Sequence, residues 1–160
     1  MKFDLEELVA GVFLDVYATV FGMEMKVDQS GAALPAGEPN IAGAVGFFGD
    51  MTGVAYIYSP VSFARRLTAR MAGLDETEFV TDEMVNDSVG ENTNTVMDAV
   101  RAKLSERGVG CVLTAPSIVR GSSFVLDPET DAERVVCSFI NESRQPVVME
   151  LLIKPSEPNV

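Results

Sequence analysis

The stretch that decides the fold runs from Thr81 to Arg107 and reads TDEMVNDSVGENTNTVMDAVRAKLSER. Apolar side chains recur in it at spacings of four and seven residues, which is typical of one face of a long helix. Thr81 is a suitable N-cap and Gly108 a suitable end, so the sequence predicts a single long helix here. The apolar stripe consists of Val85, Val89, Val96, Val100 and Leu104, with a gap at Thr93.

A second face of the same helix is polar. Four polar residues follow one another at spacings of three and four, so their side chains are neighbours on the helix surface. A carboxylate and a carboxamide held together on a rigid helix can place a water molecule against a substrate, which makes this face the candidate functional site. The four residues are Glu91, Asn94, Asp98 and Arg101.

The composition is that of a globular protein with a strong negative charge. The chain has 160 residues, enough for one domain with a full core, and we expect a single domain over residues 1–160. Hydrophobic residues make up 47% and charged residues 22% of the chain, which argues against general disorder. The net charge of −12 disfavours binding to nucleic acids and to anionic membranes.

Histidine is absent from the chain, and the only cysteines are Cys111 and Cys137. A histidine general base and histidine-ligated zinc are therefore excluded, and two thiolates alone leave a zinc ion short of its usual ligands. The chain has no apolar run of about 18 residues that could span a membrane. The first residues, MKFDLEE, lack the basic and then apolar order of a secretory signal, so the cytoplasm is the expected location.

Periodicity predicts two further helices, over residues 5–20 and 59–72, with Ser59 as the N-cap of the second and Pro60 at its first helical position. Short links between the later strands predict a largely antiparallel sheet of about six strands. Helices should pack as a layer on one face of this sheet, which is an α+β fold. The predicted strands cover residues 23–28, 41–48, 53–58, 109–119 with a possible extension over 124–126, 133–141 and 147–154.

The long helix contains the motif Asp87-x-x-x-Glu91-x-x-Asn94, and Pro116 follows it. The strings NDSVGENTN, VRAKL and LTAPSIVRG resemble the CheX/CheC family of chemotaxis phosphatases, and the order of predicted elements resembles that family across nearly the whole chain. The family's motif is an aspartate or serine, a glutamate and an asparagine on one helix, with a distal proline.

Only one copy of this motif is present. The first helix offers acidic residues, but no asparagine occurs before Asn40. A single copy resembles the CheX-like branch of the family, which implies a homodimer with one site per subunit.

The resemblance implies an aspartyl-phosphate protein phosphatase that acts on the phospho-aspartate of a CheY-like response-regulator receiver, in chemotaxis or another two-component pathway. An acyl phosphate is already activated, so the enzyme must mainly place one water in line with phosphorus. We expect Asn94 to orient this water, because an amide donates and accepts hydrogen bonds and stays neutral. Glu91 should meet a receiver lysine. We expect a divalent metal, Mg²⁺, in the receiver and no cofactor in this chain.

Three further residues belong to the candidate site. Asp87 is expected to orient the docking face, although a favourable position near the helix N-terminus explains it equally well. Asp98 stands where the family commonly has a small residue, and Ala99 where it has an asparagine. As an extra carboxylate on the docking face, Asp98 either repels the phosphoryl group or the receiver's acidic pocket, or pairs with a second cation. Pro116 interrupts a predicted strand, so we expect it at an edge or bulge, with a structural role.

Two other functions stay open at this point. The first is a non-catalytic module of the same fold that binds phosphorylated receivers, an alternative suggested by Asp98. The second is a dimeric scaffold that associates through a sheet edge and contacts no phosphoprotein.

Overall fold

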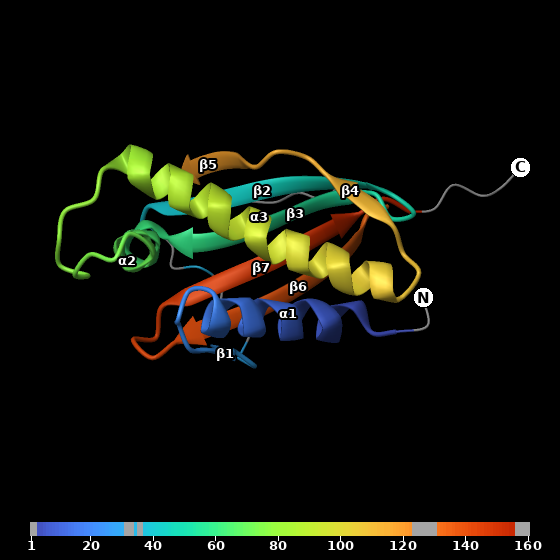
Figure 1. Ribbon diagram of the computed structural model, residues 1–160, viewed down its shortest axis with the longest axis horizontal. Helices are drawn as coiled ribbons and strands as arrows, with labels where there is room; N and C mark the ends of the chain where they lie inside the picture. The colour runs from blue at the N-terminus through green and yellow to red at the C-terminus, as the bar shows by residue number, and fades with distance from the viewer. Residues whose placement is uncertain (1–2, 31–33, 35–36, 123–130, 156–160) are drawn as a thin grey trace, which may run out of the picture.

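The computed structural model describes residues 3–30, 34, 37–122 and 131–155, and these form three helices and seven strands (Figure 1). The predicted extension over residues 124–126 lies outside the described residues. The helices are α1 (Leu5–Thr19), α2 (Val61–Met71) and α3 (Asp82–Glu106). The strands are β1 (Met25–Val27), β2 (Asn40–Gly49), β3 (Gly53–Pro60), β4 (Cys111–Leu113), β5 (Ser117–Gly121), β6 (Glu133–Asn141) and β7 (Pro146–Ile153).

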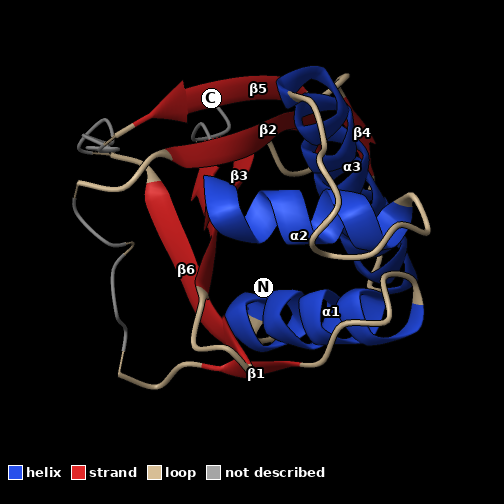
Figure 2. Ribbon diagram, turned by 90° about the vertical axis from the view of Figure 1, so that its left-hand side faces the viewer, coloured by secondary structure: helices blue, strands red, loops and turns tan. Residues whose placement is uncertain are grey.

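The strands form one antiparallel sheet in the order β1-β6-β7-β3-β2-β4, and β5 also pairs with β2. All three helices cover the same face of this sheet, as Figure 2 shows from the side. The predicted α+β fold, with an antiparallel sheet and helices on one face, is therefore confirmed. None of the helices in the described part of the chain is long and apolar enough to cross a membrane.

Two local predictions are wrong. The sequence predicts one strand over residues 109–119, but the chain leaves the ladder at residues 114–116 and forms two strands, β4 and β5. Pro116 has no N–H to donate to a ladder, which explains the break and the seventh strand. Ser59 does not cap α2, because it is part of strand β3 and lies opposite Ile41 of β2. Pro60 is the N-cap and makes no side-chain capping bond.

The apolar stripe of α3 is buried against the sheet and the other helices. Thr93, the gap in the stripe, is fully buried as well. Its hydroxyl donates a hydrogen bond to the Val89 carbonyl oxygen at 2.8 Å, so the polar group has a partner in the core. Opposite it lies Gly43 of β2, where an added Cβ would come within 2.0 Å of Thr93 Oγ1. The glycine thus allows α3 to lie directly on the sheet.

The order of elements repeats although the sequence does not. In the first half, helix α1 is followed by the edge strand β1 and the hairpin β2–β3. In the second half, helix α3 is followed by the edge strands β4 and β5 and the hairpin β6–β7. Each edge pairs with the hairpin of the other half, β1 with β6 and β4 and β5 with β2, and the pair β3–β7 joins the halves at the centre. The helices that begin the two halves, α1 and α3, contact each other on the same face of this sheet.

Candidate active site

The N-terminus of α3 is held by a cap and by two arginines from other elements. Thr81 Oγ1 accepts a hydrogen bond from the backbone N–H of Met84 at 3.1 Å, which confirms the predicted cap. In the first turn, Asp82 pairs with Arg65 of α2 at 3.2 Å and with Arg120 of β5 at 3.9 Å. These contacts fix the start of α3 between α2 and the sheet edge.

The middle of α3 is joined to α1 by a buried hydrogen bond that the sequence analysis missed. The Tyr17 hydroxyl donates to Asn92 Oδ1 at 2.9 Å, and the two residues are 1% and 2% exposed. Burial raises the pKa of Tyr17, and the bond to Asn92 offsets only part of this effect, so the phenol keeps its proton and remains a donor. The only feature of the sequence that points to this buried bond is the position of Asn92, which lies off the polar face, about 100° from Glu91 around the helix.

The polar face of α3 points to solvent. Glu91 and Asn94 are exposed, and neither side chain makes a hydrogen bond or ion pair with any residue that the structure describes. Asp87, one turn earlier, is also exposed and unpaired within the described residues. One rigid helix thus carries these side chains on an accessible face, although the catalytic and docking roles assigned to them stay predictions.

Asp98 is paired with a cation of its own helix. Arg101 donates to Asp98 Oδ1 from Nη2 at 2.8 Å and from Nε at 3.1 Å. In the free chain Asp98 thus forms an ion pair within α3, and which of the two alternatives applies to a docked receiver stays a prediction. Because the side chains of Arg101 and Asp98 are 39% and 61% exposed, solvent screens the pair and it adds little stability. Its importance is that the carboxylate at the end of the polar face is partly neutralised.

Pro116 lies beside the polar face, in the turn between β4 and β5. Its Cγ is 3.6 Å from the position that a Cβ on Gly90 would occupy, and Gly90 directly precedes Glu91. The turn is tied to β2 by two hydrogen bonds with Gly46, one to Thr114 Oγ1 at 2.8 Å and one from the Thr114 N–H at 2.9 Å. The structure therefore brings Pro116 next to the motif helix, and its structural role stays a prediction.

The cysteines do not resemble nucleophiles. Burial, with smaller contributions from Glu6 and Asp4, raises the pKa of Cys137 to about 11. Burial also raises the pKa of Cys111. Both thiols therefore stay protonated and weakly reactive near neutral pH. Within the described ranges, no group of three or more acidic or cysteine side chains is arranged to hold a metal ion.

Comparison with known proteins identifies the class of protein that this fold and helix define. The family model described as chemotaxis phosphatase CheX matches residues 41–140, which include all of α3. The chain belongs to this family of chemotaxis phosphatases. Among curated proteins, no sequence matches it.

Solved structures agree on the fold. Chemotaxis protein CheX from Vibrio vulnificus is similar with a TM-score of 0.79 and 19% identity, over 96% of this chain and 99% of that one. CheX from Desulfovibrio desulfuricans gives a TM-score of 0.78 with 19% identity, over 95% and 100%. A chain of the CheX–CheY–BeF3–Mg²⁺ complex from Borrelia burgdorferi gives 0.75 with 16% identity, over 96% and 100%. At these identities the likeness shows a common fold.

Proposed function

We propose that this protein dephosphorylates the phospho-aspartate of a CheY-like receiver domain by positioning the attacking water. The observation that carries the proposal is the pair Glu91 and Asn94, exposed and unpaired within the described residues, on a helix whose opposite side is buried. Side chains in this arrangement are free to enter the active site of another protein. Membership of the CheX phosphatase family supports the same reaction.

In the proposed reaction, the receiver docks on the polar face of α3, and the Asn94 amide binds one water in line with the phosphorus. The water oxygen forms a bond to phosphorus while the bond from phosphorus to the aspartate oxygen breaks. The products are inorganic phosphate and the free carboxylate of the receiver. Because the acyl phosphate is already activated, placing the water supplies most of the acceleration.

Glu91 would pair with a lysine of the receiver and so set the position of Asn94 relative to the phosphoryl group. Asp87 would help to orient the docked receiver, and Pro116 would support the wall of the site beside Gly90. We propose that the receiver binds the Mg²⁺ ion, so that this chain needs no cofactor of its own. Support comes from the Borrelia complex, whose components include CheX, CheY, BeF3 and Mg²⁺.

We also propose a homodimer with one site per subunit, because the single copy of the motif resembles the CheX-like branch of the family, for which the resemblance implies a homodimer. The cytoplasm, where receiver domains would be accessible to it, stays the proposed location.

Asn94→Ala tests the mechanism, because alanine keeps the helix but cannot hold the water. We expect the acceleration of phosphate release from a labelled phospho-receiver to fall by about 100-fold or more. The circular dichroism spectrum and the melting temperature should stay those of the parent. Ser105→Ala, an exposed polar change further along α3, is the matched control and should keep full activity. An Asn94→Ala variant as active as the parent would refute the mechanism.

The same assay, combined with a measurement of receiver binding, separates the two alternative functions. A non-catalytic module would bind a receiver loaded with beryllium trifluoride but leave the half-life of its phosphate unchanged. A scaffold would bind no receiver at micromolar concentration. Testing a panel of phosphorylated receivers also identifies the partner.

A further inference from the structure

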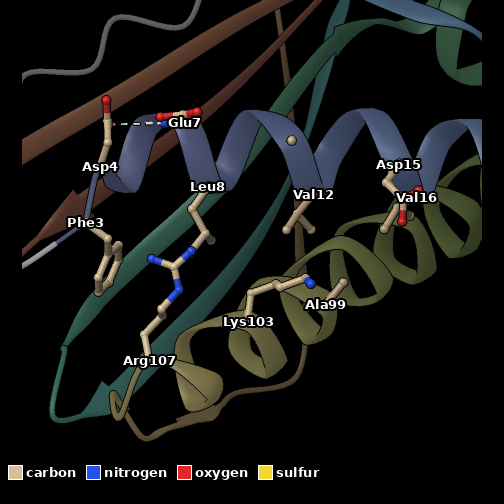
Figure 3. Close-up of a pocket in the computed structure, with 11 residues that line it drawn as sticks. Phe3, Asp4, Glu7, Leu8, Val12, Asp15, Val16, Ala99, Lys103 and Arg107 are labelled. Carbon is tan, nitrogen blue, oxygen red and sulfur yellow. Dashed lines mark hydrogen bonds between the residues drawn. The ribbon is translucent and has the colours of Figure 1, made fainter.

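A groove of about 640 Å³ runs between α1 and α3 (Figure 3), and neither Glu91 nor Asn94 is among the residues that line it. The two helices are antiparallel, since Tyr17 meets Asn92 at one point and Phe3 meets Arg107 near the opposite ends. At the second point the Arg107 guanidinium lies over the Phe3 ring, 5.2 Å from its centroid. The groove lies between α1 and the C-terminal half of α3.

Small residues on both helices hollow out the groove. Gly11 of α1 and Ala99 of α3 both line it, and an added Cβ at Gly11 would meet no atom within 4 Å. The apolar lining comes from Leu8, Val12 and Val16, of which the two valines are buried. The groove therefore combines an apolar lining with free space at its centre.

The two sides of the groove carry opposite charges. Acidic residues lie on α1 and at its N-cap, whereas Lys103 lies on α3 and Arg107 at its C-cap (Figure 3). No ion pair within the described part of the chain crosses the groove. Lys103 pairs instead with Glu106 of its own helix, at 3.7 Å. The acidic and the basic side chains thus line opposite sides of the groove without pairing directly, and Figure 3 shows the carboxylates of Asp4 and Glu7 on the side of α1 that is turned away from α3. The acidic residues are Asp4, Glu7 and Asp15.

We propose that this groove binds an amphipathic α-helix of a partner protein. The apolar stripe of that helix would lie over Gly11, its basic edge along α1 and its acidic edge along α3. Such a helix fills the hollow and pairs both rows of charge, which is the usual logic of helix-in-groove recognition. The groove follows α1 from Phe3 to Val16, about 20 Å at 1.5 Å per residue, so it accommodates a partner helix of about four turns.

A designed peptide serves as the probe. It has about 16 residues, a stripe of leucine and alanine, lysines along one edge and the same number of glutamates along the other. Because its net charge is zero, the net charge of −12 on the protein does not attract it. We expect saturable binding below about 1 mM. In ¹⁵N NMR titrations, the shifted signals should belong to residues 3–16 and 99–107, and not to Glu91 or Asn94.

Gly11→Leu should weaken binding by about 10-fold or more, because the new side chain fills the hollow. The variant should fold, since its Cβ enters open space and leucine is the better helix former. Ala18→Leu, at an exposed position of α1 outside the groove, is the matched control and should bind as the parent does.

Changing both Lys103 and Arg107 to glutamate makes both sides of the groove acidic. This double variant should bind the neutral peptide about 10-fold more weakly and gain affinity for a peptide with lysines on both edges. Asn94→Ala should bind the neutral peptide normally, which separates this proposal from the phosphatase mechanism.

The proposal fails if the peptide gives no saturable shifts, or gives them elsewhere on the molecule. It fails equally if Gly11→Leu binds as tightly as the parent, or if Asn94→Ala abolishes binding. A parent that does not bind the peptide but self-associates, with Gly11→Leu dissociating it, would assign the groove to a second copy of this chain instead.

Discussion

Asp98 shares its Oδ1 atom with two nitrogens of Arg101, at 2.8 and 3.1 Å. A receiver that approaches the polar face of α3 therefore meets a paired carboxylate one turn beyond Asn94, in place of a bare negative charge. This matters because the phosphoryl group and the acidic pocket proposed for the receiver are themselves negative. If the proposed function holds, we expect Arg101 to reduce the repulsion between Asp98 and the receiver.

Arg101→Ala should therefore raise the KM for the phosphorylated receiver, because it exposes the charge of Asp98. An exposed pair contributes up to about 1 kcal/mol, so the change should be no more than about fivefold, with kcat nearly unchanged. Asp98→Ala should change KM less, and the double variant should bring it back toward the parent value. Steady-state phosphate release measures all three.

Lys103→Ala is the control for the loss of a cation, because Lys103 lines the groove beside α1. It should leave KM within experimental error of the parent. A double variant as impaired as Arg101→Ala would mean that Arg101 contacts the receiver directly.

Tyr17 makes stability sensitive to alkaline pH. Its pKa is raised by burial, so the unfolded chain loses this proton at about pH 10 while the folded chain keeps it. The stabilisation is fully present below about pH 10 and is lost as the pH rises above it. For this one group the free energy of unfolding should fall by up to about 1.4 kcal/mol per pH unit.

Tyr17→Phe removes this contribution. The variant should be less stable than the parent at pH 8, because Asn92 loses its partner in a buried site, at a cost of about 1 to 3 kcal/mol. Its stability should then decline less steeply above pH 10. Urea unfolding at a series of pH values measures both effects, and parallel curves for parent and variant would contradict the argument.

At the scale of secondary structure elements, the position of α3 depends on contacts at Gly43 and Tyr17. Gly43 lets the helix lie against β2 through Thr93, and Tyr17 ties the middle of the helix to α1. The polar face of α3 points outward because the rest of the helix is held from below and from one side. A helix that shifted on the sheet would carry Glu91 and Asn94 with it.

Gly43→Ala should destabilise the protein by about 1 to 3 kcal/mol, since its Cβ would overlap Thr93 Oγ1. The proposed phosphatase activity should also fall, because α3 must move away from the sheet. Gly11→Ala is the matched control. It adds the same methyl group in open space on α1 and should stabilise the protein by up to about 1 kcal/mol.

Chemical denaturation of both variants measures these changes in the free energy of unfolding. Equal stability of Gly43→Ala and the parent would show that α3 accommodates the methyl group without strain.

At the scale of the whole molecule, the two halves of the chain are interlocked. The edge strands of each half pair with the hairpin of the other half, and β3 pairs with β7 across the centre. Neither half therefore contains all the partners of its own strands. The single domain predicted over residues 1–160 stays a prediction, and this exchange provides its test.

Separate fragments of residues 1–73 and 74–160 should each lack a cooperative unfolding transition, because each would expose strand edges and apolar surface that the other half covers. Mixed in equal amounts, they should recover the circular dichroism spectrum of the intact chain. A fragment 1–73 that unfolds cooperatively on its own would contradict the single domain.

Local sequence patterns were sufficient to predict most of the helices and strands and the polar face of α3. The apolar spacing from Val85 to Leu104 predicted the long helix, because a helix on a sheet must bury one stripe of side chains. The spacing of Glu91 and Asn94 placed both on an accessible face for the same geometric reason. Ser59 was assigned wrongly, because its place in β3, opposite Ile41 of β2, outweighs its local tendency to cap a helix.

The sequence by itself determined which residues have helical or strand periodicity, and which side chains share a face, because these depend on neighbours along the chain. Only the tertiary structure decided that Asn92 binds Tyr17 and that small residues at Gly11 and Ala99 leave a groove. The same holds for the exchange of strands between the two halves. These features join residues far apart in sequence, and their geometry depends on how the helices settle on the sheet.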